Sequence, residues 1–410
     1  MQVVYTHCAG LDVHKKTVVA CAITPNQKGG WQKEIRNFST MTKDLLNLSD
    51  WLTSKGCTHV AMESTGDYWR PVFNILEGNL EVILVNARHI KAVPGRKTDI
   101  KDSQWIAELL QHGLLRPSFI PGVEQRDLRD LTRHRRNFVR ERVNLVNRVQ
   151  KVLEAANIKL GCVASDVMGV SGRAMLAALV EGQSTPEAMA ELAKGTMRDK
   201  RELLVQALEG RVRPSQQFIL AQLLAQIDSI DQTIALFDQQ IEDYCRPFQK
   251  AIELVDTIPG IARRTAEIIV SEIGTDMSRF PTAEHLAAWA GVAPGNYESG
   301  GKTLSSRTRQ GNRTLRAILV QAAHGLSRTP TYLAAQYRRL AARRGKKRAA
   351  VAVAHSILVI AYHLISRQEP YKDLGADYFD QQRPEYVKRR LIKRLEKLGY
   401  QVTVEPVAAT

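Results

Sequence analysis

Two stretches with a seven-residue repeat of apolar side chains set the strongest limit on how this chain can fold. In the first, over residues 128–152, apolar residues recur at alternating spacings of three and four, and Arg135 and Arg142 occupy the two positions that the pattern leaves vacant. The second runs unbroken over residues 220–241. This spacing predicts two long helices that form a coiled coil or pack as a helical hairpin. A pair of this length separates the chain into a part before it and a part after it.

The part before the long helices alternates between strand and helix patterns. Apolar runs predict strands at 7–13, 17–24, 31–39, 59–64 and 81–87, and amphipathic runs predict helices at 42–56, at 67–79 and around Ile106. Three successive strands with short turns form an antiparallel meander, and the later strands join as parallel neighbours through helical crossovers. This order is typical of the ribonuclease-H-like α/β fold. We therefore predict an α/β domain over residues 1–117, followed by α-helical domains.

Four acidic residues fall where such a sheet gathers functional side chains. Asp12 and Glu63 end the first and fourth strands, which are neighbours in a ribonuclease-H-like sheet. Asp99 and Asp102 continue the apolar stripe of the next helix, so both are expected to point inward. Inward carboxylates are costly unless a positive partner meets them. We predict two Mg²⁺ ions here, since Mg²⁺ prefers oxygen ligands and two ions about 4 Å apart can serve one phosphodiester.

Each of these acids also has an ordinary structural interpretation. Asp12 could simply end a strand, Glu63 could start a turn, and Asp99 could favour the helix dipole. Asp67 is assigned to such a role, at the start of a helix. Four acids at the four expected positions together favour the metal site.

The positive charge of the chain is concentrated in one segment. The 410 residues carry 58 basic and 42 acidic side chains, a formal charge of +16. Residues 299–368 contain 14 Lys or Arg and no acid, so the rest is nearly neutral. A solvated basic face is the alternative, but a segment of this kind is expected to contact polyphosphate.

Cysteine usage and hydropathy indicate a cytoplasmic protein. The five cysteines are scattered without CxxC spacing, which argues against disulfides or a zinc site. The start of the chain has no signal-peptide pattern. The most apolar run, residues 349–365, contains two histidines and is predicted to be a buried helix, so no membrane partner is expected.

The chain after the first domain is predicted to be mainly helical. We place a helical domain at 121–248, a second one at 251–368 and a basic extension at 369–410. The sequence IELVDTIPGIARRTAEIIVSEIG resembles a helix–hairpin–helix, whose backbone N–H groups grip a phosphate. Ala262 stands where that motif usually has a second glycine, so a plain packed helical hairpin is the alternative. A Gly-rich loop and further basic helices follow.

Several of these motifs together carry a family resemblance. GLDVHKKTVVACAI, the Glu of MESTG, KTDIKD, GVAPGNYESGGK and RTLRAILVQAA occur in this order, over residues 5–115 and 252–330. They resemble the DEDD-type insertion-sequence transposases, and specifically insertion-sequence family one-ten, the bridge-RNA-guided serine recombinases. The motifs are specific in combination and weak singly.

The resemblance implies a site and partners. It implies a RuvC-like domain that holds Mg²⁺ through Asp12, Glu63, Asp99 and Asp102, and a nucleophilic serine that maps onto Ser299. It also implies a guide RNA that pairs with target and donor DNA, and a homodimer or homotetramer joined through the coiled coil. The family's Asp-Ser-Gly-Lys loop is here Glu-Ser-Gly-Gly-Lys. Nearby competitors for the nucleophile are Ser305 and Ser306.

The residues around Ser299 suit this chemistry without the family. A serine hydroxyl attacks phosphorus poorly unless the phosphate charge is neutralised and the hydroxyl proton is removed. Gly300 and Gly301 allow close approach of the backbone to a strand. The nearby cations expected to bind nucleic acid are Lys302, Arg307, Arg309, Arg313 and Arg316. GGKT also resembles the end of a nucleotide-binding P-loop, but Asn296 stands where that motif needs its first glycine.

Three functional hypotheses follow from the sequence. The first is a DNA transposase or site-specific recombinase that cuts and rejoins strands through a covalent phosphoserine. The second is a Mg²⁺-dependent junction resolvase or nuclease that uses water. The third is a non-catalytic scaffold that binds nucleic acid. A covalent protein–DNA adduct separates the first from the others.

Overall fold

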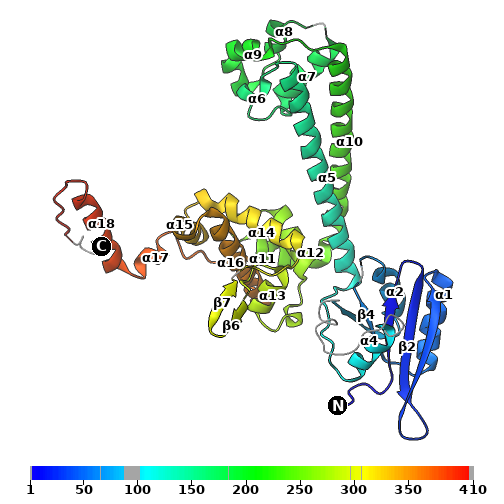
Figure 1. Ribbon diagram of the computed structural model, residues 1–410. Coiled ribbons are helices and arrows are strands. Elements are labelled where there is room, and N and C mark those ends of the chain that lie inside the picture. Colours follow the sequence, from blue (N-terminus) through cyan, green and yellow to red (C-terminus); the bar gives the residue numbers. More distant parts are fainter. Residues whose placement is uncertain are drawn as a thin grey trace. The chain divides into compact units, whose positions relative to one another are not determined.

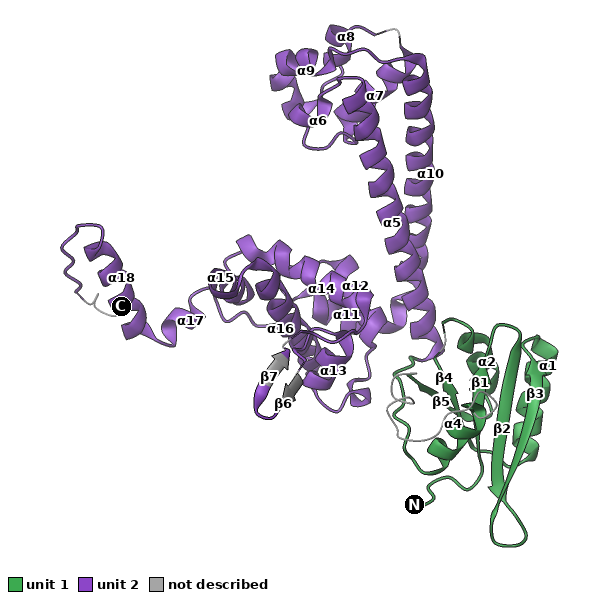
Figure 2. Ribbon diagram, in the orientation of Figure 1, with its two compact units in different colours: residues 1–121 green, residues 122–410 purple. Residues whose placement is uncertain are grey.

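The computed structural model describes residues 2–64, 66–86, 102–182, 184–295, 297–305 and 307–405, with the backbone alone at 297–299, 303 and 304. The chain divides into two compact units, residues 1–121 and 122–410 (Figure 2). The first unit is a mixed α/β domain and the second is mainly helical.

Unit 1 is built on a five-stranded sheet with the order β3-β2-β1-β4-β5 (Figure 1). Its strands are β1 (Cys8–Val13), β2 (Thr17–Pro25), β3 (Trp31–Ser39), β4 (His59–Glu63) and β5 (Glu81–Val85). The first three pair antiparallel, whereas β4 pairs parallel with both β1 and β5. The five predicted strands and their meander are confirmed. The ribonuclease-H-like, RuvC-like assignment stays a prediction.

The two faces of the sheet are covered by different helices. Alternate residues of β1 point to opposite faces, as in any strand. Leu11 packs with α1 (Thr42–Ser54) and α2 (Trp69–Leu76) in one core. Cys8 packs on the other face with Ile106 of α4 (Asp102–Gln111). Ile106, Leu109 and Leu110 are all buried, so the predicted apolar stripe of this helix is confirmed.

Unit 2 begins with two long helices, α5 (Val123–Ala155) and α10 (Pro214–Tyr244). They are antiparallel, because Arg135 pairs with Asp238 while Arg142, further along α5, pairs with Asp231, nearer the start of α10. Both arginines thus fill the vacant positions of the repeat with ion pairs. The two helices form a helical hairpin, which was one of the two predicted arrangements. A coiled coil between subunits stays a prediction.

Short helices pack at the end of this hairpin where α5 ends and α10 begins (Figure 1). They are α6 (Leu160–Val163), α7 (Val170–Glu181), α8 (Pro186–Ala190), the 3-10 helix Gly195–Lys200 and α9 (Arg201–Leu208). Met175, Leu176 and Leu204 form a buried cluster there with Val149 of α5 and Leu220 of α10. The cluster closes the hairpin with an apolar core of its own.

The rest of unit 2 is a helical body that carries one small hairpin of strands. Its main elements are α11 (Gln249–Asp256), α12 (Arg263–Ile273), α13 (Ala283–Ala290), β6 (Tyr297–Ser299), β7 (Lys302–Ser305), α14 (Arg313–Gly325), α15 (Tyr332–Arg344) and α16 (Lys346–Arg367). Short 3-10 turns lie at Arg246–Phe248, Met277–Arg279 and Leu326–Arg328, and the C-terminal extension holds α17 (Tyr378–Gln381) and α18 (Pro384–Glu396). The helices predicted on both sides of the Pro-Gly turn are present as α11 and α12.

Helix α16 is the core of this body. Its length and composition alone would allow it to cross a membrane. Val353, Ile357 and Ala361 are fully buried, and the helix packs against α11, α13, α14 and α15. The predicted buried helix over residues 349–365 is therefore confirmed. The subdivision of unit 2 at residues 248–251 and 368–369 stays a prediction.

Candidate active site

Two of the four predicted acids end neighbouring parallel strands. The register pairs Leu11 of β1 with Met62 of β4, so Asp12 and Glu63 come one residue later on each strand. Both fall on the sheet face that carries Ala61, which is the face that α4 covers. The side chain of Asp12 is 22% exposed. Two carboxylates therefore lie side by side at one end of this face.

Helix α4 brings Asp102 to the same end. The helix runs antiparallel to β1, because the Gln111 carbonyl near its end accepts from Val4 N–H, while Ser103 at its start lies over Gly10. A β-carbon at Gly10 would stand 2.2 Å from the Ser103 carbonyl oxygen, so only glycine allows this approach. Asp102 is the first residue of the helix. It precedes Ser103 and therefore lies further toward the carboxyl end of β1.

The remaining predictions about the acids differ in outcome. Asp99 and the segment 87–101 lie outside the described residues. Asp67 is 87% exposed and pairs with Arg70 at 3.4 Å just before α2, as expected of a helix-start residue. His14, which the sequence did not single out, places Nε2 3.1 Å from Oδ2 of Asp12.

The chemistry of this donor set suits a hard cation. Asp12, Glu63 and Asp102 offer carboxylate oxygens, which Mg²⁺ prefers. Within the described ranges, no three His, Cys, Asp or Glu side chains lie close enough together to hold a metal ion, so Asp12, Glu63 and Asp102 do not form such a group in this structure. The predicted set includes Asp99, so the fourth ligand is outside what the structure describes. The residues present fit Mg²⁺ in the type of their side chains, and Asp12 and Glu63 lie on neighbouring strands of the sheet.

Ser299 lies on a two-stranded hairpin, where the sequence led us to expect a loop. Strands β6 and β7 pair antiparallel, with Ser299 opposite Lys302. Gly300 and Gly301 form the two-residue turn between them, with φ of 58° and 73°. Positive φ at both turn residues is the hallmark of a type I′ turn and explains the pair of glycines. This hairpin also excludes the P-loop interpretation, in which the glycines precede a helix.

The base of this serine hairpin, residues 291–311, is closed by backbone contacts. Pro294 and Thr308 form an isolated bridge, and Gly295 N–H donates to the Arg307 carbonyl at 3.0 Å. A β-carbon at Gly311 would stand 2.3 Å from the backbone nitrogen of Gly291, so the two arms of the hairpin are in backbone contact there. Of the predicted cations, Lys302, Arg307, Arg309 and Arg313 are exposed and Arg316 is half-buried. Ser306 lies outside the described residues, and Ser305 Oγ accepts from Arg307 N–H.

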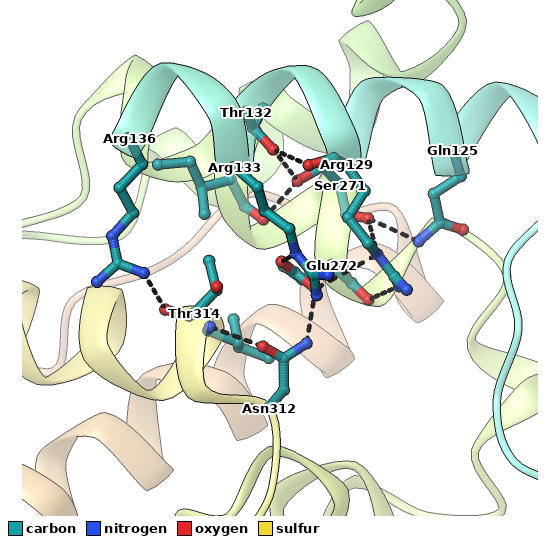
Figure 3. Close-up of polar contacts among 11 residues, drawn as sticks. Gln125, Arg129, Thr132, Arg133, Arg136, Ser271, Glu272, Asn312 and Thr314 are labelled. Carbon is teal, nitrogen blue, oxygen red and sulfur yellow. Dashed lines mark hydrogen bonds and ion pairs between the residues drawn. The ribbon is translucent and has the colours of Figure 1, made fainter. Parts of the chain in front are cut away.

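A fully buried carboxylate lies where α5, α12 and the start of α14 meet (Figure 3). Glu272 is 0% exposed. Its Oε1 accepts from Arg133 Nε at 2.7 Å, and its Oε2 accepts from Arg133 Nη2 at 2.8 Å and Asn312 Nδ2 at 2.6 Å. Arg129 Nη2 donates to its backbone carbonyl at 2.6 Å. The sequence analysis missed Glu272, although it lies on the apolar stripe of its helix, three residues after Ile269 and four after Ile268.

The turn between α15 and α16 is strongly basic. Its cations are Arg343, Arg344, Lys346, Lys347 and Arg348, all exposed. Among the described residues, no hydrogen bond or ion pair is made by these five side chains. Lys346, Lys347 and Arg348 occupy the first turn of α16, where positive charge opposes the helix dipole. The cluster therefore does not serve the fold, and it was not among the predicted site residues.

Buried thiols are excluded as nucleophiles. All five cysteines are free, and only Cys162 is exposed. Burial raises the pKa of Cys8 and of Cys245 to about 12, and that of Cys21 and of Cys57 to about 11. A raised pKa keeps these four thiols protonated near neutral pH, and the protonated form is unreactive.

Two models of known protein families match separate parts of this chain. The IS110 DEDD model, described as "Transposase", matches residues 9–158, and the model "Transposase IS116/IS110/IS902 family" matches residues 252–338. The chain carries transposase domains of the IS110/IS116 family. The first transposase domain covers Asp12, Glu63, Asp99 and Asp102, and the second covers the serine hairpin.

Individual proteins are similar to this chain over different shares of its length. The transposase for insertion sequence element IS1111A of Coxiella burnetii is 26% identical over 376 residues, which are 88% of this chain and 90% of the relative. The transposase for IS1328 of Yersinia enterocolitica is 26% identical over 68% of this chain and 73% of its own length. The pilin gene-inverting protein of Moraxella bovis is 33% identical over 34% of this chain and 45% of its own length.

Proposed function

We propose that this chain is a DNA transposase that cuts and rejoins strands through a covalent phosphoserine at Ser299. The observation that carries the proposal is the place of the two candidate sites within the matched domains. The matched transposase domains contain the acidic end of the sheet, which residue chemistry singled out, and the serine hairpin, whose residues suit nucleophilic attack on a phosphate. The names of relatives, including a gene-inverting protein, support an enzyme that acts on DNA.

The proposed step forms one bond and breaks another. The Ser299 hydroxyl loses its proton to a base and its Oγ bonds to phosphorus. The bond from phosphorus to one bridging oxygen of the strand breaks, and that oxygen leaves as a hydroxyl after taking up a proton. The hydroxyl of another strand reverses the step and releases the serine. Phosphodiester energy is conserved, so no nucleotide is consumed.

The acidic end of unit 1 is proposed to supply the metal. Asp12, Glu63, Asp99 and Asp102 would hold Mg²⁺, which would neutralise the phosphate and stabilise the attacking and leaving oxygens. Lys302, Arg307 and Arg309 beside the nucleophile orient the phosphate and balance its charge. Ser299 and the acids act on the same phosphodiester, within one chain or between two.

The family resemblance extends the proposal to partners. A guide RNA would pair with target and donor DNA, so that protein contacts go mainly to the backbone. A homodimer or homotetramer would bring two copies of the site to two strands. RNA sequencing of nucleic acid that copurifies with the chain tests the first point, and light scattering tests the second.

The test of the proposed chemistry is a covalent adduct. Wild-type protein, incubated with element-end DNA and Mg²⁺ and then denatured, is expected to show a protein–DNA band that protease removes. Ser299→Ala is expected to lose the band completely, and Ser305→Ala is the matched control that keeps it. Cleavage that persists in Ser299→Ala would instead indicate a nuclease that uses water. Absence of cleavage by wild type under all conditions would indicate a binding scaffold.

The basic turn between α15 and α16 is expected to contact the nucleic-acid backbone. Each phosphate contact contributes about −0.9 to the slope of log affinity against log salt for duplex DNA. The double variant Arg344→Ala with Lys347→Ala should therefore make that slope less negative by up to about two. It should also weaken binding equally across sequences. Lys159→Ala, which removes an exposed lysine already paired with Glu154, is the control. Titration of labelled duplexes at several salt concentrations measures the slope, and an unchanged slope would contradict the contact.

A further inference from the structure

We infer that the contact between Asn312 and Glu272 is a positioning device that ties the base of the serine hairpin to helix α5 through Glu272. The inference rests on the proposed role of Ser299. It assigns to Asn312 a function beyond that of an ordinary helix cap. Figure 3 shows the two residues where α5, α12 and α14 meet.

Glu272, on α12, is held by residues of two other elements, α5 and the start of α14. Arg133 of α5 makes a two-pronged contact with its carboxylate, and Arg129 of the same helix donates to its backbone carbonyl. Both arginines lie on one face of α5, one turn apart. A further turn along, Arg136 Nη1 donates to the Thr314 carbonyl at 3.5 Å. Helix α5 is thus bound to α12 and to the first turn of α14.

The choice of asparagine at position 312 points to a role beyond capping. Asn312 Oδ1 accepts from Leu315 N–H at 3.0 Å, which caps α14. Asn and Asp cap helix N-termini about equally well. Only the amide also offers a donor, and Asn312 Nδ2 uses it on Glu272 Oε2 at 2.6 Å. An aspartate there would place two carboxylates together in a buried site, which costs several kcal/mol. The buried glutamate, not the helix, therefore requires the amide.

Asn312 is also joined directly to the base of the serine hairpin. Its backbone N–H donates to the Trp289 carbonyl at 3.3 Å, at the end of α13. The preceding residue, Gly311, lies against Gly291 on the opposite arm of the hairpin. The hydrogen bond between Gly295 and Arg307 lies further along the two arms. A displacement of Asn312 is transmitted through this base to the strands that carry Ser299. The contact with Glu272 thus sets where the hairpin stands relative to α5.

The decisive experiment is a charge-swap cycle between the two residues. Asn312→Asp keeps the helix cap but turns the donor into a second carboxylate. We expect the single-turnover rate of the Ser299 adduct, at saturating DNA, to fall about ten- to a hundredfold. The DNA affinity should stay within about twofold, since the variant leaves every exposed cation of the hairpin and of the basic turn in place. Adding Glu272→Gln to Asn312→Asp restores one amide and one carboxylate between the two positions, so this double variant should regain part of the lost rate although Arg133 loses its two-pronged contact.

The control separates positioning from general stability. Thr331 caps α15 by accepting from Ala334 N–H, and it does not contact Glu272. Thr331→Ala should lower thermal stability but leave the adduct rate unchanged. If Asn312→Asp proves poorly folded, Asn312→Ser serves in its place, because it keeps a capping oxygen and adds no charge. Equal rate losses in Asn312 and Thr331 variants, or a double variant no faster than Asn312→Asp alone, would overturn the inference.

A second readout does not depend on the proposed chemistry. Amide hydrogen exchange in residues 297–305 should be faster in Asn312→Asp, return toward the wild-type rate in the double variant and be unchanged in Thr331→Ala. If wild type forms no adduct, the proposed function fails while this exchange pattern still supports the positioning contact. Unchanged exchange in Asn312→Asp would contradict the contact itself.

Discussion

Asp102→Asn is expected to reduce strand cleavage about a thousandfold or more while leaving the fold intact. Asp102 lies at the start of α4, toward the end of the sheet where β1 and β4 place Asp12 and Glu63. Converting one carboxylate to an amide removes a charged ligand but changes little in volume. Because acids gathered on one face repel each other without a cation, the metal-free variant should be as stable as wild type or slightly more stable.

Thermal unfolding gives a readout of this site apart from activity. A ligand that binds only the folded state stabilises it in proportion to the logarithm of its concentration. Millimolar Mg²⁺ should therefore raise the Tm of wild type and have a smaller effect on Asp102→Asn or Asp12→Asn. Asp67→Asn is the matched control, since Asp67 is an exposed acid of the same unit with a helix-start role. An Asp102→Asn protein that cleaves at the wild-type rate would refute the metal site.

Glu272→Gln is expected to lower the free energy of unfolding of unit 2 by about 3–5 kcal/mol, the usual effect of removing one partner from a buried ion pair. The glutamine keeps the shape of Glu272 but leaves Arg133 and the half-buried Arg129 without their carboxylate. The amide nitrogen of glutamine would also face either an arginine or the donor group of Asn312. The loss should appear in urea unfolding followed by circular dichroism at 222 nm, which reports mainly on this helical unit.

An exposed ion pair provides the comparison for that measurement. Glu154 and Lys159 pair at the end of α5, with side chains 59% and 43% exposed. Exposed pairs typically contribute about 0–1 kcal/mol, so Glu154→Gln should change stability by less than that. A loss below 1 kcal/mol in Glu272→Gln would show that the arginines find other partners. In that case the buried contacts of Glu272 would contribute no more to stability than an exposed ion pair does.

Sequence patterns predicted the elements of unit 1 closely. The predicted strands agree with β1 to β5 within two residues at each end. Each is a short apolar run bounded by turn residues, and helices of clear period separate the later ones, so local signals and the fold agree. Asp12 and Glu63 could be placed side by side because parallel pairing of the first and fourth strands follows from the element order.

Unit 2 was harder to predict because its decisive contacts are non-local. The seven-residue repeat indicates paired helices but does not give their direction; that follows from the contact of Arg135 with Asp238. The serine hairpin was expected as a loop because its strands have three and four residues, below the length at which alternation can be recognised. Its Gly-Gly turn was the available signal. Glu272 was missed because its partners lie more than a hundred residues earlier on α5.

The contact between Gly10 and the backbone of α4 has a consequence for the spacing of the acids. Strand and helix touch main chain to main chain there, with no side chain of variable size between them. The separation between the sheet and the helix is consequently set by the radii of backbone atoms. Substitutions on the outer surface of α4 can accumulate without altering this separation, whereas a single methyl group at residue 10 would push the helix outward and carry Asp102 away from its neighbours.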